Sequence, residues 1–333
     1  MHKNSSFSPA MLKFRHHFMR ALRDFLDNSG FIEVETPYLI KANTPDPYID
    51  PIYALLLHPK KHAMQLRTSP EIWLKKALGL GLDQIYELAR VFRDDPLGHA
   101  HHREFTMLEW YRTKADLSDL LKDTKDIFNL AISLKKEHFG QANTPPISFK
   151  SHSVRDLFLI LADIDLDHTL REMELGQENS LQDLLLTRKE HLPSNCSFVD
   201  AFFHVMLKYI EPNLNKEEAT VITRWPVQLA ALAAPCEDDA RYSGRFEIYY
   251  QGLEIANAYQ ECNEKEVLLK RFTKENRMRS LLGKQQFPID HAFLEAISSM
   301  PKTAGIALGV DRLLLSILKL SHLRDLIFGY DDL

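Results

Sequence analysis

The sequence FRDDPLGHAHHREFTMLEWY occupies positions 92–111, and the architecture expected for the chain follows from it. Apolar and polar residues alternate on either side of its polar centre, which predicts strands over 84–92 and 104–112. Residues 93–103 then form the loop of a hairpin. Arg93 opens this loop and indicates a site for an anionic ligand, because a planar guanidinium can meet two phosphate oxygens at once.

A second stretch of this kind, GIALGVDRLLL, lies at 305–315. It predicts a glycine-containing strand that runs into a helix, with Arg312 near the start of the helix. Gly309 lacks a β-carbon, so the backbone there can approach a ligand closely. We expect Arg93 and Arg312 to converge on one triphosphate as the catalytic cations, because attack on the α-phosphorus gathers negative charge on its oxygens.

The composition bounds the class of protein. The chain has 333 residues, of which 45% are hydrophobic and 26% charged, as in an ordinary soluble globular protein. Its formal net charge of −5 argues against a general surface for nucleic acid. Cys196, Cys236 and Cys262 form no CxxC pair, so we expect free thiols in a reducing compartment. No signal stretch and no run near the roughly 20 apolar residues of a membrane span occur, which favours a cytoplasmic protein without membrane contact.

The pattern of elements predicts an α+β fold, with an antiparallel sheet flanked by helices. Apolar residues recur at three- and four-residue steps from Met11 to Phe25, as in an amphipathic helix. After a strand at 62–67, Ser69 and Pro70 are typical of the cap and first turn of a helix. No GxGxxG turn and no P-loop occur, which disfavours a doubly wound fold. The other expected elements are strands over 31–35, 245–261 (with a turn at Gln251-Gly252) and 304–309, and helices over 116–138, 264–282, 288–299 and from Val310.

Two groups of polar residues could hold a metal ion. Glu254 and Glu261 lie seven residues apart in an otherwise apolar segment, where an unpartnered carboxylate is costly to bury. They could hold Mg²⁺ that bridges ATP phosphates, or each could form a salt bridge with a basic neighbour. His99, His101 and His102 lack the cysteine or carboxylate that would complete a ligand set, which favours a loop that closes over ATP.

These segments resemble the motifs of class II aminoacyl-tRNA synthetases. From about Ala10 to Leu333 the chain is similar to the lysyl-tRNA-synthetase-related ligases that modify elongation factor P with (R)-β-lysine. The segments that carry the resemblance are GFIEVETP at 30–37 (motif 1), FRDD with EFTMLEWYR (motif 2), GIALGVDR (motif 3), and the lysine-type segments TSPE at 68–71 and GLEIANAYQE at 252–261.

The resemblance implies a role for each matching residue, an ATP substrate with Mg²⁺, and a homodimer. Glu254 and Glu261 would hold the magnesium. The amino-acid substrate would contact Ser69, Pro70, Glu71, Tyr111, Glu261 and Ala307. ATP would contact Arg93, Asp94, Asp95, His102, Glu254, Ile255, Gly309 and Arg312.

The chain departs from the family pattern at several residues that are expected to contact the nucleotide. Asp94 and Asp95 stand where the family usually has Asn-Glu, His102 stands where asparagine is usual, and Pro96 stiffens the loop. An aspartate is one methylene shorter than a glutamate, so its contact with the adenine base of ATP changes. These departures bear on ATP affinity and rate more than on the type of reaction.

Two features indicate the acceptor of the activated group. Only 29 residues precede Gly30, so we expect a single domain over 1–333, with an insertion at about 140–225 and no N-terminal anticodon-binding OB domain. Ala307 stands where lysyl-tRNA synthetases typically have glycine, which reshapes the pocket beside the substrate's amine. The resemblance therefore implies transfer of (R)-β-lysine, through its adenylate, to a lysine ε-amine of elongation factor P, without tRNA. Two alternatives stay open: a truncated lysyl-tRNA synthetase paralogue, and a non-catalytic regulator.

Overall fold

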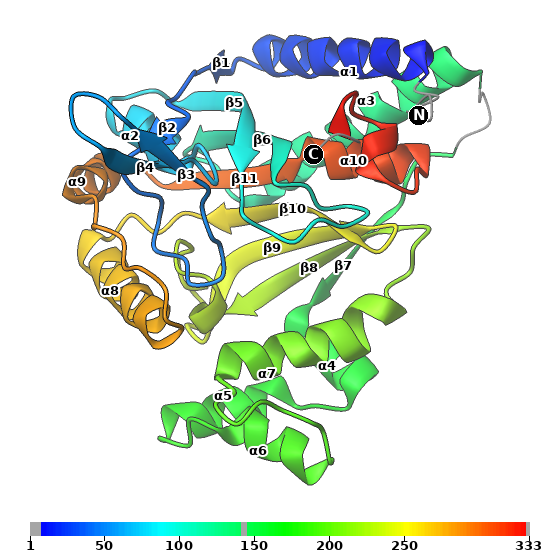
Figure 1. Ribbon diagram of the computed structural model, residues 1–333. Helices are drawn as coiled ribbons and strands as arrows, with labels where there is room; N and C mark the ends of the chain where they lie inside the picture. The colour runs from blue at the N-terminus through cyan, green and yellow to red at the C-terminus, as the bar shows by residue number, and fades with distance from the viewer. Residues whose placement is uncertain (1–7, 141–144, 331–333) are drawn as a thin grey trace, which may run out of the picture. The chain divides into compact units, whose positions relative to one another are not determined.

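The computed structural model describes residues 8–140 and 145–330, in two compact units (Figure 1). The first unit combines the chain up to Ile147 with the chain from Ile255, and the second is Ser148–Glu254. The expected insertion at about 140–225 falls largely in the second unit, and its residues 141–144 lie outside the described ones. The organisation as one domain with an insertion stays a prediction.

The sheet of the first unit contains the hairpin predicted around 93–103, and that prediction is confirmed. β5 and β6 pair antiparallel, with Leu88 opposite Leu108. β11 pairs antiparallel with β6, and β10 with β11, whereas β1 is parallel to β5. The expected α+β fold is confirmed, and the short parallel pair of β1 with β5 makes its otherwise antiparallel sheet mixed. Its strands are β1 (Ile32–Glu33), β5 (Gln84–Phe92), β6 (Glu104–Thr113), β11 (Thr303–Gly309) and β10 (Leu253–Gln260).

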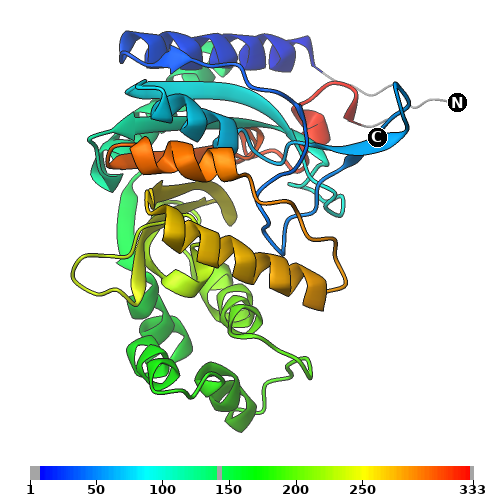
Figure 2. The same ribbon diagram turned by 90° about the vertical axis from the view of Figure 1, so that its left-hand side faces the viewer.

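Helices cover this sheet in two groups. α3 packs against α1, α10 and β11, whereas α2 packs on β5 and β6, α9 on α2, and α8 on α9 (Figure 2). A small separate sheet has the strand order β2-β4-β3. The bounds are α1 (Pro9–Asn28), α2 (Glu71–Gly79), α3 (Leu117–Phe139), α8 (Lys265–Leu281), α9 (His291–Ser299), α10 (Val310–Leu318), η4 (Leu323–Asp325), β2 (Leu39–Ile40), β3 (Tyr53–Leu56) and β4 (His62–Leu66). Within residues 8–140 and 145–330, no helix combines the length and apolar character that crossing a bilayer requires.

The predicted start of α2 needs one correction. The sequence favoured Ser69 as the cap, but Pro70 occupies the N-cap position and the helix begins at Glu71. The Ser69 hydroxyl accepts a hydrogen bond from the Glu71 backbone N–H (2.9 Å) and donates one to Glu109 on β6 (2.7 Å). Ser69 therefore joins the helix to the sheet.

Strand alternation separates the two faces of β6. Phe105, Met107, Glu109 and Tyr111 share one face, because side chains two residues apart point the same way. The intervening Trp110 points to the other face, where its indole N–H donates to Asp123 on α3 (3.1 Å). The face away from α3 therefore carries the acidic and phenolic side chains.

The second unit contains three strands and a hydrophobic core of its own. β7 is parallel to β8, and β8 is antiparallel to β9. Phe158, Phe202 and Trp225 lie in a buried cluster with the four helices of this unit. The sequence analysis predicted no strands over 149–153 and 219–226, so it missed β7 and β8. The bounds are β7 (Phe149–Ser153), β8 (Ala219–Pro226), β9 (Tyr242–Tyr250), α4 (Val154–Ala162), α5 (Leu166–Glu174), α6 (Ser180–Thr187), α7 (Phe198–Val205), the π-helix η1 (Met206–Ile210), η2 (Glu211–Asn213) and η3 (Val227–Leu229).

Candidate active site

A buried lysine joins two of the predicted substrate-binding residues. Lys75 lies one turn after Glu71 on α2, and its Nζ atom is 2.6 Å from Oε2 of Glu261, at the end of β10. The same Nζ atom forms an ion pair with Glu71. The side chains of Lys75 and Glu261 are each 1% exposed, whereas that of Glu71 is 16% exposed. The structure therefore brings Glu71 and Glu261 together, although they are far apart in the sequence.

A third carboxylate, Glu109, completes this group. It accepts hydrogen bonds from the Ser69 hydroxyl (2.7 Å) and from the Tyr111 hydroxyl (3.0 Å). The Lys75 ammonium lies 5.9 Å from the centre of the Tyr111 ring. We call the six side chains the carboxylate cluster: Ser69, Glu71, Lys75, Glu109, Tyr111 and Glu261.

Burial keeps protons on this cluster. Burial, with the nearby Glu71 carboxylate, raises the pKa of Glu109 to about 8. Burial also raises the pKa of Glu261 to about 7, although Lys75 acts in the opposite direction. Burial alone would lower the pKa of Lys75, but the Glu261 and Glu71 carboxylates raise it above its ordinary value. The lysine therefore stays charged while the carboxylates compete for protons near neutral pH.

Strand β11 leaves room beside the cluster because its facing residues are small. Gly305 is opposite Tyr111, and Ala307 is opposite Glu109. A β-carbon at Gly305 would overlap the Tyr111 ring and the Glu261 carboxylate. Ala307, predicted to shape the substrate pocket, lies beside a cluster carboxylate, and its role there stays a prediction.

The predicted phosphate contact Arg93 lies at the end of the same strand face. Its guanidinium is 5.3 Å from the centre of the Phe105 ring, and its Nε–H donates to the carbonyl of Thr68 (3.4 Å). Thr68 directly precedes Ser69. Arg93 and the carboxylate cluster are therefore linked through the strand end and the segment before α2.

Arg312, the other predicted phosphate contact, meets the hairpin loop from α10. Its Nε–H donates to the carbonyl of Ala100 (3.4 Å), and its Nη2 lies 2.7 Å from Nε2 of His101. Gly309 caps this helix, and a β-carbon there would lie 3.8 Å from the carbonyl of Ile255. The structure thus brings Arg312, Gly309 and Ile255 to one end of β10 and β11.

The remaining loop residues of the predicted ATP site lie near the surface. The Asp94 backbone N–H donates to Asp50, and its carboxylate pairs with Arg103 at 3.3 Å, where both side chains are more than half exposed. Asp95 is half-buried in the loop. Direct contact of these aspartates with nucleotide stays a prediction.

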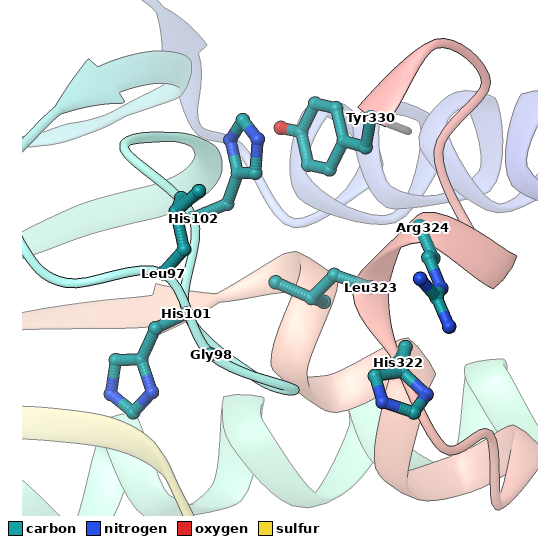
Figure 3. Close-up of a pocket in the computed structure, with 8 residues that line it drawn as sticks. All are labelled: Leu97, Gly98, His101, His102, His322, Leu323, Arg324 and Tyr330. Atoms are coloured by element: carbon teal, nitrogen blue, oxygen red, sulfur yellow. The ribbon is translucent and has the colours of Figure 1, made fainter. Parts of the chain in front are cut away.

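His102 is anchored by an aromatic stack. Its ring stacks on Tyr330, with centroids 3.7 Å apart and planes 10° from parallel (Figure 3). The Tyr330 hydroxyl in turn donates to the Glu104 carbonyl. Next to this stack lies a cavity of about 180 Å³. Its lining residues are Leu97, Gly98, His101, His102, His322, Leu323, Arg324 and Tyr330.

Glu254 belongs to the second unit, so its predicted pairing with Glu261 around magnesium stays a prediction. Within its own unit it lies near Glu247 and Glu211. Burial, and then the Glu254 carboxylate, raises the pKa of Glu211, and burial with Glu254 also raises that of Glu247 to about 7, against the effect of Arg245. Among residues 8–140 and 145–330, no group of three or more His, Cys, Asp or Glu side chains has an arrangement that could hold a metal ion.

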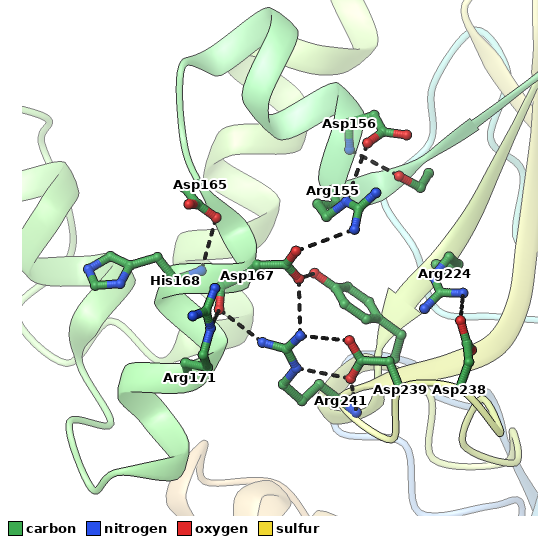
Figure 4. Close-up of polar contacts among 12 residues, drawn as sticks. Arg155, Asp156, Asp165, Asp167, His168, Arg171, Arg224, Asp238, Asp239 and Arg241 are labelled. Atoms are coloured by element: carbon green, nitrogen blue, oxygen red, sulfur yellow. Dashed lines mark hydrogen bonds and ion pairs between the residues drawn. The ribbon is translucent and has the colours of Figure 1, made fainter.

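A second polar cluster in this unit has a structural role. Asp167 on α5 accepts a hydrogen bond from Tyr242 (2.8 Å) and forms ion pairs with Arg155 and Arg241 at 3.4 Å (Figure 4). Arg241 also pairs with Asp239 at 2.6 Å. Each carboxylate faces a guanidinium, and the network ties α4 and α5 to the start of β9.

The sequence reasoning missed two members of the carboxylate cluster, Lys75 and Glu109. Glu109 could have been found by the argument applied to Glu254, because it is a carboxylate in an apolar strand. Lys75 follows Glu71 by four residues on a helix, a spacing that usually indicates a solvent-exposed pair. Only the tertiary structure distinguishes this buried pair from a surface one.

Comparisons with known proteins show the family to which the chain belongs. The family model of class II tRNA synthetases (D, K and N) matches residues 2–329. The elongation factor P--(R)-beta-lysine ligase of Erwinia tasmaniensis is 32% identical over 97% of this chain and 95% of its own length. The proteins of the same name from Salmonella gallinarum and Haemophilus ducreyi are 32% and 30% identical, over 96% and 95% of this chain and 94% and 93% of their own lengths.

The close approach at Gly305 gives a stability prediction. Gly305→Ala should lower the free energy of unfolding by about 1–3 kcal/mol, because Tyr111 or Glu261 must move away from the added methyl group. Gly309→Ala is the matched control, since the nearest atoms to its β-carbon lie at 3.7–3.8 Å, and it should cost roughly 0.5 kcal/mol or less. Urea unfolding measures both, and equal losses would contradict the packing described.

The raised pKa of Glu109 gives a pH prediction. The folded protein holds a proton on this carboxyl that the unfolded chain has lost, so the free energy of unfolding should fall as pH rises toward about 8. Glu109→Gln should flatten this fall. Glu190→Gln is the control: hydrogen bonds from Lys208, Tyr209 and His204 hold the Glu190 pKa near about 2, so its contribution is constant above pH 5. An unchanged slope in Glu109→Gln would refute the assignment.

Proposed function

The chain belongs to the class II tRNA synthetase family (D, K and N), and from this membership we propose that it is an ATP-dependent ligase that joins (R)-β-lysine to elongation factor P. The observation that carries the proposal is the carboxylate cluster. Two buried carboxylates and a partly exposed third, beside a strand end with an arginine, suit a substrate that has ammonium groups at one end and reacts with ATP at the other. Relatives about 32% identical over nearly the full chain bear the name of this activity.

The first step is adenylate formation. A carboxylate oxygen of (R)-β-lysine attacks the α-phosphorus of ATP, the bond to the bridging oxygen of the β-phosphate breaks, and pyrophosphate leaves. Arg93 stabilises the charge that gathers on the α-phosphate oxygens, and Arg312 holds the far phosphates. The carboxylate cluster orients the substrate through its amines, with Tyr111 on the wall and Pro70 fixing the start of α2.

Magnesium suits the carboxylates of this fold family and would neutralise the departing pyrophosphate. Glu254 would supply one metal contact, and its carboxylate acts on Glu247 and Glu211, whose pKa values it raises. We retain Glu261 as the second metal contact. Its ion pair with Lys75 also supports a role in binding the substrate amine.

In the second step the lysine ε-amine of elongation factor P attacks the carbonyl carbon of the adenylate. The amide bond forms, the bond to the phosphate oxygen breaks, AMP leaves, and the amine loses a proton. The adenylate is already activated, so the protein need not form a covalent intermediate. We further propose a cytoplasmic homodimer that acts without tRNA.

The acceptor is tested by intact-mass analysis. Incubation of elongation factor P with the protein, ATP, magnesium and (R)-β-lysine should add the mass of one β-lysyl residue. Lysine should react more slowly, and total tRNA should not be charged. Charging of tRNA with lysine would instead favour a truncated lysyl-tRNA synthetase paralogue, and no AMP formation with any amino acid would favour a regulator.

The phosphate assignment is tested at Arg93. Arg93→Ala should slow substrate-dependent pyrophosphate exchange by roughly two to three orders of magnitude, because one cation at the transition state is lost. Arg23→Ala serves as the control, since Arg23 forms an exposed pair with Glu33 at 3.0 Å. A rate for Arg93→Ala near that of the control would show that another group stabilises the α-phosphate.

A further inference from the structure

The segment that connects β2 to β3, residues 41–52, carries a buried asparagine outside the segments of the family resemblance. Asn43 is 6% exposed. Its Nδ2 atom donates to the Leu66 carbonyl (3.2 Å), and its Oδ1 atom accepts from the Thr68 backbone N–H (2.8 Å) and from the Thr68 hydroxyl (3.1 Å). A neighbouring parallel strand bonds in the same way to the residues before and after one position. The Asn43 carboxamide therefore takes the place of a peptide unit beside the chain that leaves β4.

Gln65 fixes the orientation of this carboxamide. The Oε1 atom of Gln65 accepts hydrogen bonds from the Asn43 backbone N–H (2.8 Å) and from Asn43 Nδ2 (2.9 Å), and Gln65 is itself buried. Exchanging Oδ1 and Nδ2 of Asn43 would set an oxygen against two oxygens and an N–H against the Thr68 N–H. The network is satisfied in one orientation, so Asn43 holds Thr68 in one position.

Thr68 is the residue through which Asn43 reaches Arg93. The backbone N–H of Thr68 donates to Asn43, and the carbonyl of Thr68 accepts a hydrogen bond from Arg93 Nε–H (3.4 Å). The Arg93 guanidinium also lies 5.3 Å from the centre of the Phe105 ring. One backbone residue thus separates the buried carboxamide from the guanidinium, and a displacement of Thr68 displaces a hydrogen-bond acceptor of Arg93.

The segment 41–52 also supports the residue that follows Arg93. The Asp50 carbonyl accepts a hydrogen bond from the Asp94 backbone N–H (2.8 Å). The same segment is tied to α8, because the buried Arg279 side chain donates to the Asp46 carbonyl (2.6 Å). The connection between β2 and β3 therefore holds Arg93 at two points, one beside its guanidinium and one in the adjoining backbone.

We propose that Asn43 is a positioning residue for the first step: it orders Thr68 so that the Thr68 carbonyl aims the Arg93 guanidinium at the α-phosphate of ATP. The inference rests on the proposed function, because it requires Arg93 to act on that phosphate. Asn43 acts through Thr68 and takes no part in the chemical step. A cation stabilises a transition state only where its N–H groups point at the developing charge, so a small displacement lowers the rate.

Removal of the carboxamide should act on the rate more than on substrate binding. Asn43→Ala should lower kcat of pyrophosphate exchange with (R)-β-lysine roughly tenfold, with a smaller change in KM for the amino acid, because Thr68 loses its partner and Arg93 moves with it. Gln182→Ala is the matched control. Gln182 is a buried carboxamide of the second unit that donates to the Cys196 carbonyl (3.3 Å), and its removal should leave kcat unchanged.

A double-mutant cycle with Arg93→Ala separates positioning from a structural role. A residue that acts through Arg93 has little further effect once the guanidinium is gone, so Asn43→Ala should lower kcat less than about twofold in the Arg93→Ala background. A merely structural role would give the same loss in both backgrounds. Equal losses would overturn the proposal, as would a native kcat in Asn43→Ala alone.

Asn43→Asp keeps the test decisive if Asn43→Ala fails to fold. Its carboxylate retains an oxygen for the Thr68 N–H and loses the donor to the Leu66 carbonyl, and the same cycle with Arg93→Ala applies to it. The cycle is repeated on the dissociation constant of ATP with magnesium, measured by titration calorimetry without amino acid. Additive losses, with elongation factor P gaining mass, would overturn the role of Asn43 alone. Coupling of Asn43 to Arg93 in ATP binding, with no gain of mass, would refute the proposed function alone.

Discussion

The ion pairs of Lys75 with Glu71 and Glu261 are the interaction on which the rest of the site depends. They join the first turn of α2 to the end of β10, and Ser69 joins the same helix to Glu109 on β6. Removing one member of a buried pair leaves an uncompensated charge, which is strongly destabilising. The same pairs therefore hold three distant segments together and fix the positions of the carboxylates. If the proposed substrate binds at these carboxylates, stability and substrate recognition depend on the same ion pairs.

This arrangement is possible because of small residues on β11. Gly305 and Ala307 lie opposite Tyr111 and Glu109, and the Tyr111 ring and the Glu261 carboxylate occupy the space that a β-carbon at Gly305 would take. At the other end of the face, the ring of Phe105 lies under Arg93. One sheet face thus runs from anionic groups suited to amines to a cation suited to phosphate. The reacting carboxyl of an amino acid held by its ammonium groups would lie between these ends, where the developing charge needs an arginine.

Sequence patterns that depend only on neighbouring residues, such as strand alternation and turn sequences, predicted the strands well. The alternation over 84–92 and 104–112 predicted the hairpin of β5 and β6, and the segment 245–261 with its Gln251-Gly252 turn predicted β9 and β10, because these signals depend on neighbouring residues alone. The parallel pairing of β1 with β5 was not predictable in this way, since partners far apart in sequence decide it. At the site, Arg93 and Arg312 stood out by their context. Lys75 did not, because its spacing from Glu71 also fits an exposed helical pair, and only packing against Glu261 buries it.

Among the hairpin-loop residues that were expected to depart from the family pattern, His102 is the one whose contacts the structure explains. An asparagine at 102 could offer hydrogen bonds, whereas His102 offers an aromatic face, and it stacks on Tyr330. Tyr330 is held by its hydrogen bonds to the Glu104 carbonyl and from Arg90 (3.3 Å). The stack therefore anchors the loop to the C-terminal segment from the side, and Arg312 holds it at the Ala100 carbonyl. Stacking between rings adds roughly 0.5–1.5 kcal/mol beyond burial. That contribution helps to hold the hairpin loop against the C-terminal segment, whichever ligand the loop meets.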